Sequence, residues 1–348
     1  MRRLPVYLVI DTSESMAGPA IEAVRAGVAD LFRFVRSDPS ALETVYLSMI
    51  TFASRARQDI PLSSVTAVQA PDCLVLGSGT SLGAALVLLE QCLAREFVKT
   101  TAEIKGDYKP LIFILTDGDP TDDWRAVAAR IKTELSDRRA TVVAVACGED
   151  ADISTLRCIT DDVLHAPQLT PEAISSLFRY MSASVVTASQ ALGDKMPLQE
   201  LTGDLVKKAP VESAMPPRRP GGRYAYVRAR CVRDRRLYIM RYAAVPRSDS
   251  RGASGEIYVG VGAHVVERFD FESDQPDSGP AYAASQLRSS PPCPCCGGNY
   301  WCVCGCGKIH CAPNTTETTI TLTCPWCGSA STYEFGESAD FEIGGTLG

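Results

Sequence analysis

The sequence is poor in histidine, the side chain that most often transfers protons near neutral pH. Its 348 residues include three histidines, His165, His264 and His310. None lies in a His-Glu-x-x-His pattern or in a recognisable arrangement with a nucleophile, and no Gly-x-x-x-x-Gly-Lys-Ser/Thr phosphate loop occurs. We therefore expect a protein that is not an enzyme, with a Mg²⁺-dependent hydrolase as the enzyme alternative.

Long apolar runs are also lacking. No uninterrupted apolar stretch approaches the roughly 20 residues that a membrane-spanning helix needs. The first apolar run, 6–10, is too short for a signal-peptide core and is followed at once by Asp11. We expect a cytoplasmic protein with no membrane partner. The formal net charge of -6 gives the whole chain no general attraction to nucleic acid.

Short β-branched runs alternate with longer helical periods up to about residue 190. The predicted strands are 7–10, 45–50, 111–115, 141–145 and 162–164, and the predicted helices are 20–36, 81–98, 124–135 and 171–189. The strands are apolar throughout, as expected when helices cover both faces of a parallel sheet. Residues 1–190 are therefore predicted to form a doubly wound, mostly parallel, Rossmann-like α/β domain.

The composition changes after this domain. A stretch rich in proline, glycine and charge, 207–222, predicts a linker, which we place at 191–222. Segments 224–243 and 257–271 are rich in β-branched and aromatic residues and predict a small antiparallel sheet. Together with a cysteine cluster at 293–327, they form a second region, 223–348.

Carboxylates and hydroxyls follow two of the predicted strands. Asp11 ends the first strand and precedes Ser13 and Ser15, and Asp117 ends a later strand. Both acids should lie at the carboxyl edge of the sheet, where open α/β sheets place ligand sites. A loop at 77–81 can bring the Thr80 hydroxyl to the same edge. Because these are hard oxygen ligands, the pattern predicts a Mg²⁺ site.

The same residues resemble the metal-ion-dependent adhesion site of von Willebrand factor A domains, through 11–16, Thr80 and 116–120. Other segments are similar to the TerY proteins of bacterial tellurite-resistance systems, namely 2–7, 38–39, 41–48, 105–107, 109–110 and 119–124. This likeness covers residues 1–189. The later cysteine-rich segment is similar to the metal-binding extension of some TerY proteins.

The resemblance implies both ligands and partners. It implies that Asp11, Ser13, Ser15, Thr80 and Asp117 bind Mg²⁺, or Mn²⁺ or Ca²⁺ in its place, directly or through water. A partner protein would then present an Asp or Glu to the ion. Family members occur with a protein kinase and a metal-dependent, PP2C-type phosphatase, which implies a scaffold or regulator in phosphorylation signalling linked to tellurite resistance or stress.

Nine of the 14 cysteines crowd one segment, and we expect thiolate metal ligation there rather than disulfides. Segments 293–297 and 324–328 each have the Cys-Pro-x-Cys-Gly form of a zinc knuckle, whose glycine permits the tight turn. Pairing the two knuckles predicts one structural zinc site. Its ligands would be Cys293, Cys296, Cys324 and Cys327.

The cysteines between the knuckles leave two alternatives open. Cys304, Cys306 and Cys311 could form a second zinc site, with Cys295, Cys302 or His310 as the fourth ligand, or they could be packed thiols of a one-zinc ribbon. An iron-sulfur cluster also stays open. The five scattered cysteines are expected to be buried small hydrophobes. They are Cys73, Cys92, Cys147, Cys158 and Cys231.

Two further charged segments have competing interpretations. Between 224 and 242, arginines alternate with tyrosines, which suits either the solvated face of a strand or a nucleic-acid-binding adaptor. The arginines are Arg228, Arg230, Arg233, Arg235, Arg236 and Arg241. Near the adhesion-site residues, Asp119, Asp122 and Asp123 are predicted to cap the helix that begins near Trp124.

Overall fold

A computed structural model describes residues 2–116, 120–136, 140–149, 151–190, 205–209, 224–248, 254–271, 281–334, 342–344 and 346–347. The chain divides into two compact units, Met1–Pro216 and Pro217–Gly348. Each unit is described by itself.

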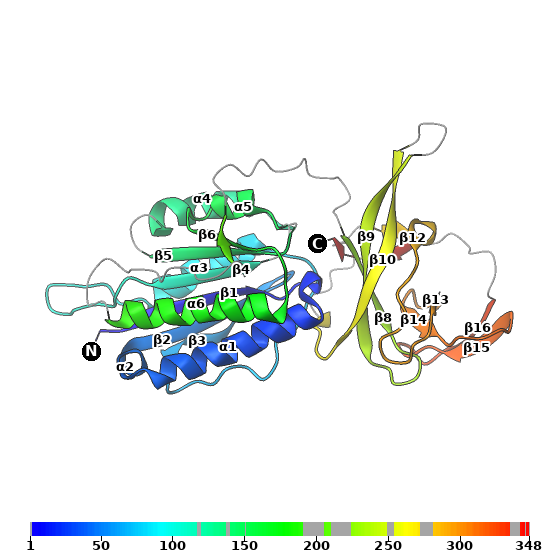
Figure 1. The fold of residues 1–348 in the computed structure, drawn as a ribbon, viewed down its shortest axis with the longest axis horizontal. Helices are drawn as coiled ribbons and strands as arrows, with labels where there is room; N and C mark the ends of the chain where they lie inside the picture. Colours follow the sequence, from blue (N-terminus) through cyan, green and yellow to red (C-terminus); the bar gives the residue numbers. More distant parts are fainter. Residues whose placement is uncertain are drawn as a thin grey trace. The chain divides into compact units, whose positions relative to one another are not determined.

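The first unit is built on one sheet with the strand order β3-β2-β1-β4-β5-β6-β7 (Figure 1). Its strands are β1 (Leu4–Asp11), β2 (Val45–Phe52), β3 (Ala56–Ser64), β4 (Leu111–Thr116), β5 (Thr141–Cys147), β6 (Val163–Ala166) and β7 (Lys207–Lys208). Neighbours pair in parallel from β2 to β6, and the edge strands β3 and β7 pair antiparallel. Every residue of β1 and β4 is buried. The predicted α/β fold is confirmed.

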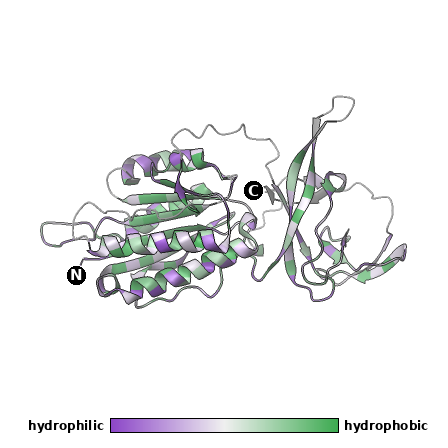
Figure 2. Ribbon diagram, in the orientation of Figure 1, coloured by the Kyte–Doolittle hydropathy of each residue, from purple (hydrophilic) through white to green (hydrophobic). Residues whose placement is uncertain are grey.

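Helices cover both faces of this sheet. On one face, α3 (Leu82–Glu96), α4 (Arg125–Ile131) and α5 (Ile153–Arg157) contribute to a core with alternate residues of β1. The other helices, α1 (Pro19–Ser37), α2 (Pro39–Thr44) and α6 (Pro171–Gln190), pack together, and α6 contacts β1. Figure 2 shows the apolar strands between helices whose residues alternate between apolar and polar. None of the helices in the described part of the chain has the length and apolarity that crossing a membrane requires.

Part of the predicted linker belongs to the first unit. Residues Lys207–Lys208 form β7 beside β6. The next residue, Ala209, is buried, and its amide donates to the carbonyl of Val163 at 2.9 Å. The linker prediction therefore differs from the structure at 207–209. A short edge strand made of lysines has no apolar period by which a sequence could identify it.

The second unit is a β-rich domain around a sheet with the order β12-β10-β9-β8-β14-β13, with β18 paired to β8. Its described strands are β8 (Tyr224–Arg230), β9 (Leu237–Ser248), β10 (Ser254–Val266), β11 (Ala281–Ala283), β12 (Leu287–Arg288), β13 (Tyr300–Val303), β14 (Ile309–Ala312), β15 (Thr319–Thr323), β16 (Ala330–Glu334), β17 (Glu342–Gly344) and β18 (Thr346–Leu347). The predicted antiparallel sheet corresponds to β8, β9 and β10.

The cysteine-rich segment joins this sheet instead of forming a separate ribbon. Its hairpin of β13 and β14 pairs in register, with Trp301 opposite Cys311. Strand β14 then pairs in parallel with the end of β8, where Ile309 lies opposite Ala229. The hairpin is therefore held against the strand that leads to Cys231. In the described part of the chain, the second hairpin, β15 and β16, pairs only within itself.

Candidate metal centres

Asp11 occupies the carboxyl end of the central strand β1 and is fully buried. The Ser13 amide donates to Asp11 Oδ1 at 2.8 Å, and the Thr116 hydroxyl, at the end of β4, donates to Asp11 Oδ2 at 2.6 Å. The hydroxyls of Ser13 and Ser15 lie 2.8 Å apart. Three of the predicted ligands thus share one edge of the sheet, as their positions at a strand end require.

The Thr80 hydroxyl is buried without a hydrogen-bond partner among the described residues. Its loop is fixed by backbone contacts: Ser81 N donates to Ala53 O at 2.6 Å, and Gly79 adopts a φ of +68°, which favours glycine. An unpaired buried hydroxyl costs free energy unless a ligand satisfies it. A bound cation would do so, and the residues present fit one in this respect.

A neighbouring loop holds the Thr80 loop in place. The Thr121 hydroxyl accepts a hydrogen bond from Thr80 N at 3.1 Å, and Thr121 N donates one to Thr80 O at 2.9 Å. Asp122 accepts from the amides of Gly83 and Ala84 at 3.0 and 2.9 Å. Asp122 therefore caps α3, not the helix near Trp124, and that prediction is wrong for this residue. The reason is that the loop folds back onto α3, a long-range contact that local sequence does not reveal.

Burial raises the pKa of Asp11 to about 6, although the hydrogen bonds from Ser13 and Thr116 act in the opposite direction. An ionised carboxylate in this position is stabilised by a cation nearby. The other predicted acid, Asp117, directly follows Thr116 but lies outside the described residues, as does Asp119. Their placement stays a prediction.

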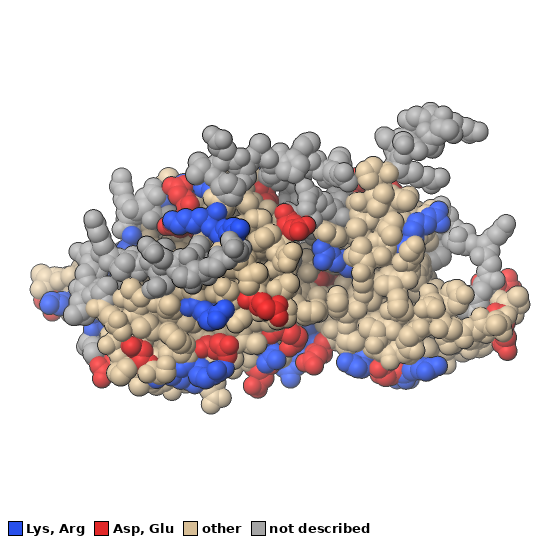
Figure 3. Space-filling view, viewed as in Figure 1, with Lys and Arg blue, Asp and Glu red and all other residues tan. Residues whose placement is uncertain are grey.

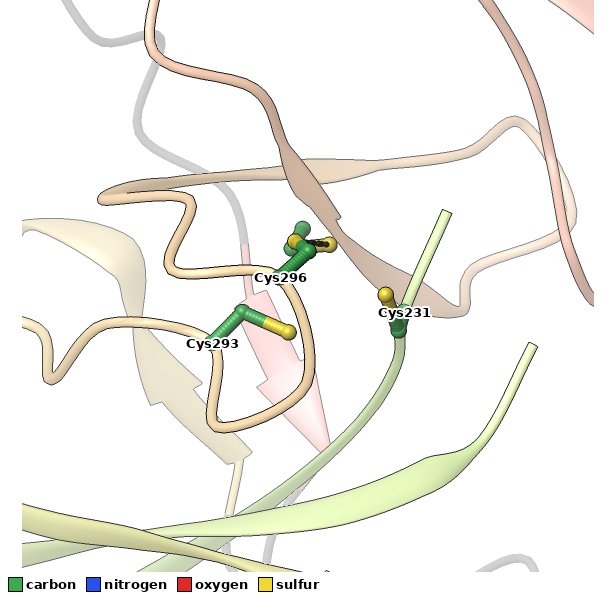
Figure 4. A group of neighbouring side chains, drawn as sticks. Cys231, Cys293 and Cys296 are labelled. Atoms are coloured by element: carbon green, nitrogen blue, oxygen red, sulfur yellow. Dashed lines mark hydrogen bonds between the residues drawn. The ribbon is translucent and has the colours of Figure 1, made fainter. Parts of the chain in front are cut away.

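Four cysteines of the second unit form a first thiol group, made of Cys231, Cys293, Cys296 and Cys311. Figure 4 shows the thiols of Cys293 and Cys296, on one tight loop, directed toward Cys231 at the end of β8. The sulfurs of Cys296 and Cys311 are 3.5 Å apart, and Val232 N donates to Cys311 Sγ at 3.2 Å. All four sulfurs lie within 4.8 Å of one another.

A second thiol group consists of Cys304, Cys306, Cys324 and Cys327. Its sulfurs approach to 3.6 Å between Cys304 and Cys327 and to 3.9 Å between Cys306 and Cys324. Tetrahedral zinc with Zn–S bonds of about 2.3 Å separates its sulfurs by about 3.8 Å. The distances in both groups match this value, so each group could hold zinc.

The structure corrects the predicted pairing of the two knuckles. Cys293 and Cys296 belong to the first group, and Cys324 and Cys327 belong to the second, so the four do not share one site. The β13–β14 hairpin explains the division, because Cys304 and Cys306 lie at its turn, whereas Cys311 lies on β14 beside Trp301. The predicted second set of Cys304, Cys306 and Cys311 is likewise divided between the groups.

Cys231 is a candidate ligand that the sequence analysis does not identify, because the sequence predicts a buried small hydrophobe at this position. It is buried, but it faces three other thiols. The available signal was its position at the end of a strand, directly before a turn. Its distance in sequence from the cysteine-rich segment hid its role.

The candidates for a fourth ligand of the second site are not used there. His310 is buried; its Nδ1 contacts the carbonyl of Cys311 at 3.0 Å, and its Nε2 contacts the Tyr333 hydroxyl at 3.0 Å. Cys302 falls in neither four-thiol group, and Cys295 lies beside the first. The second group already has four thiols, which is the number of ligands that a tetrahedral zinc site needs.

The arginines of β8 and β9 lie over aromatic rings. The Arg230 guanidinium is 4.3 Å from the centre of the Trp326 ring, Arg228 is 5.0 Å from Phe269, and Arg241 is 3.7 Å from Tyr224. These three arginines are half-buried, whereas one of the two interpretations of the sequence placed them on the solvated face of a strand. The face in Figure 3 mixes basic and acidic side chains instead of gathering one sign.

Comparison with known proteins gives two domain matches and several distant structural likenesses. Proximal thread matrix protein 1 from the mussel byssus is 16% identical over 53% of this chain and 46% of that chain, with a TM-score of 0.38. The pilus adhesin SpaC from Lactobacillus rhamnosus GG is 17% identical over 54% and 31%, with a TM-score of 0.42. The ArnB paralog VWA2 from Sulfolobus acidocaldarius is 12% identical over 80% and 69%, with a TM-score of 0.38.

The chain spans less than half the length of the mussel protein and less than a third of the adhesin that it matches, at 46% and 31%. No curated protein matches the sequence. The von Willebrand factor type A domain family matches residues 6–170, and the TerY-C metal binding domain family matches residues 223–348. The chain therefore belongs to the TerY type, in which a von Willebrand factor type A domain is followed by a TerY-C metal binding domain.

Proposed function

We propose that the protein is a non-catalytic scaffold or regulator whose von Willebrand factor A domain binds a partner protein through Mg²⁺. One observation carries this proposal: the buried Thr80 hydroxyl, which has no partner among the described residues, at a loop beside the carboxyl end of β1. Together with the buried Asp11 carboxylate, it supplies hard oxygen ligands.

The residues of this edge would act as an incomplete ligand set. Asp11, Ser13, Ser15 and Thr80, with the predicted Asp117, would bind the ion directly or through water. Mg²⁺, or Mn²⁺ or Ca²⁺, supplies a coordination position that an Asp or Glu of the partner can occupy. The hydrogen bonds from Ser13 N and Thr116 fix the Asp11 side chain before the ion binds, which lowers the entropy cost of binding.

The partners that we propose are a protein kinase, a PP2C-type phosphatase, or both, in a phosphorylation system linked to tellurite resistance or stress. The support is membership of the TerY type, because such proteins occur together with these two enzyme classes.

For the TerY-C domain we propose a structural role, in which each four-thiol group binds one zinc ion. A shell of four thiolates leaves no position for a reactive water. Burial raises the pKa of the Cys231 thiol to about 11. A bound cation would favour the thiolate and release the proton.

A pull-down with the full-length chain tests the proposal. Asp11→Ala and EDTA should each abolish Mg²⁺-dependent capture of the kinase or phosphatase. Asp30→Ala, which removes an exposed acid of α1, should leave capture intact. Capture that survives both Asp11→Ala and EDTA would contradict the proposal. Phosphate or nucleotide hydrolysis that depends on Asp117 would favour the hydrolase alternative instead.

A further inference from the structure

We propose that Cys231 bridges the first thiol group to an additional metal ion, which Asp234 and Cys295 also bind. The ligand atoms of Cys231, Asp234 and Cys295 all lie within 4.8 Å of one another. This set shares only Cys231 with the first thiol group. The additional ion rests on the zinc proposed above for the first thiol group and is independent of the Mg²⁺-dependent binding of a partner.

The turn after β8 places the Asp234 carboxylate beside the Cys231 thiol. Cys231 N donates to Arg236 O at 2.9 Å, and Arg235 N donates to Cys231 O at 3.0 Å. Arg235 adopts a φ of 62°, an uncommon conformation for a residue with a side chain. Asp234 Oδ1 accepts from Arg236 N at 3.0 Å, and its carboxylate also contacts the thiols of Cys231 and Cys295. The carboxylate is therefore positioned before any ion binds.

A comparison of the third position in the two knuckles explains why the Cys295 thiol lies beside Asp234. Both have the same turn: Gly297 N donates to Cys293 O at 2.8 Å, and Gly328 N donates to Cys324 O at 3.0 Å. The third position of the second knuckle is Trp326, whose ring nitrogen donates to the Ile309 carbonyl on β14 at 2.7 Å. That side chain thus reaches from the knuckle to a neighbouring strand.

In the first knuckle the third position carries a thiol instead of a ring. Cys295 reaches toward the turn after β8, and its sulfur meets Asp234 and Cys231. This placement gives a cysteine beyond the four that a tetrahedral zinc site uses. A knuckle that only binds a structural zinc ion does not require the additional thiol of Cys295 or the carboxylate of Asp234 beside it.

Two thiolates and a carboxylate suit a thiophilic divalent cation such as Zn²⁺ or Cd²⁺. A thiolate sulfur has more than one lone pair, so Cys231 can bind both ions at once. The first site carries net negative charge when four thiolates bind one divalent ion, and Asp234 adds to it. A second cation lowers this charge even after Cys295 releases its proton to solvent. Three protein ligands leave a fourth position for water or an external ligand.

Cadmium titration of the metal-free full-length chain tests the proposal by counting ions in native mass spectrometry. The wild-type chain should bind three Cd²⁺ ions in addition to any ion that Asp11→Ala abolishes at the proposed Mg²⁺ site, and on the same count Cys295→Ser and Asp234→Ala should each bind two. Cys302→Ser removes a buried cysteine of the same unit that belongs to none of the metal groups, so it should still bind three. Because Asp234 is exposed, its replacement leaves the core of the unit unchanged.

Cadmium-113 NMR gives a second readout, because two of the three signals should be coupled through the shared Cys231 sulfur. A wild-type chain that saturates at two ions would overturn the proposal. So would three ions in Cys295→Ser, or three uncoupled signals. If Cys295→Ser lost every ion of the unit by unfolding, the count and coupling in Asp234→Ala would decide: two uncoupled signals support the bridge, and a retained coupled pair refutes it.

Discussion

Replacing Asp122 by alanine should loosen the first turn of α3, although Asp122 belongs to a loop far along the chain. Its carboxylate accepts from Gly83 N at 3.0 Å and Ala84 N at 2.9 Å. The first amides of a helix have no partner within the helix. Losing a side-chain cap costs about 0.5–2 kcal/mol, and losing a negative charge at a helix N-terminus costs about 0.3–1 kcal/mol. We therefore expect a local loss of about 2 kcal/mol.

Hydrogen exchange measures this loss directly in the full-length chain. A cost of about 2 kcal/mol corresponds to roughly 30-fold faster exchange at the amides of Gly83 and Ala84. The matched control is Asp123→Ala, because Asp123 is the exposed neighbour of the half-buried Asp122. Equal exchange in the two variants would refute the assignment of Asp122 as the cap.

The same change should weaken Mg²⁺ binding, because Thr121 connects the loop of Asp122 to the backbone of Thr80. Thr80 N donates to the Thr121 hydroxyl, and Thr121 N donates to Thr80 O. Part of the lost energy would then appear as a fall in Mg²⁺ affinity, at most about tenfold if 1.4 kcal/mol is transmitted. Titration calorimetry measures it. Unchanged affinity together with faster exchange would show that Thr80 is positioned independently of Asp122.

Three other perturbations have expected outcomes. Burial raises the pKa of Asp11 from 3.8 to about 6, so protonation of Asp11 stabilises the metal-free fold below about pH 4, and this stability is lost as the pH rises through about 6. Mg²⁺ should therefore raise the Tm at about pH 7.5 and much less at about pH 5, and equal Tm shifts at the two pH values would contradict this. Cys231→Ser should lower the zinc content in elemental analysis, whereas the exposed Cys158→Ser should not. A Cβ on Gly27 would lie 2.2 Å from the Phe178 ring, so Gly27→Ala should lower the free energy of unfolding in urea by about 1–3 kcal/mol. A second change, Phe178→Leu, should restore part of that free energy.

The sequence predicted the sheet edge of the first unit well because the signals there are local. An apolar strand that ends in an acid places the acid at the carboxyl edge, whichever strands lie beside it. Asp11, Ser13 and Ser15 accordingly lie together. The edge strand β3 was missed because its residues are mostly half-exposed and include Pro61, so it has no apolar run. When the stability of a strand comes from pairing with its neighbour, its own apolar pattern is not enough to predict it.

The metal groups of the second unit were predicted less well, because their composition depends on topology. Each Cys-Pro-x-Cys-Gly turn is a local feature, and both were identified correctly as turns. Which two turns share an ion depends on how the β13–β14 hairpin is attached, and it pairs with β8. No periodicity in the cysteine-rich segment encodes that contact.

This topology changes what the first metal ion would stabilise. In the predicted pairing, zinc would close only the segment between Cys293 and Cys327. In the structure, the first thiol group joins the end of β8 to the first knuckle and to Cys311 on β14. An ion there would fix a contact between distant parts of the chain. Forming such a contact from the unfolded chain closes a long loop and therefore costs conformational entropy. Loss of that ion should therefore loosen the pairing of β14 with β8 as well as the knuckle, so the sheet and the metal group should unfold together.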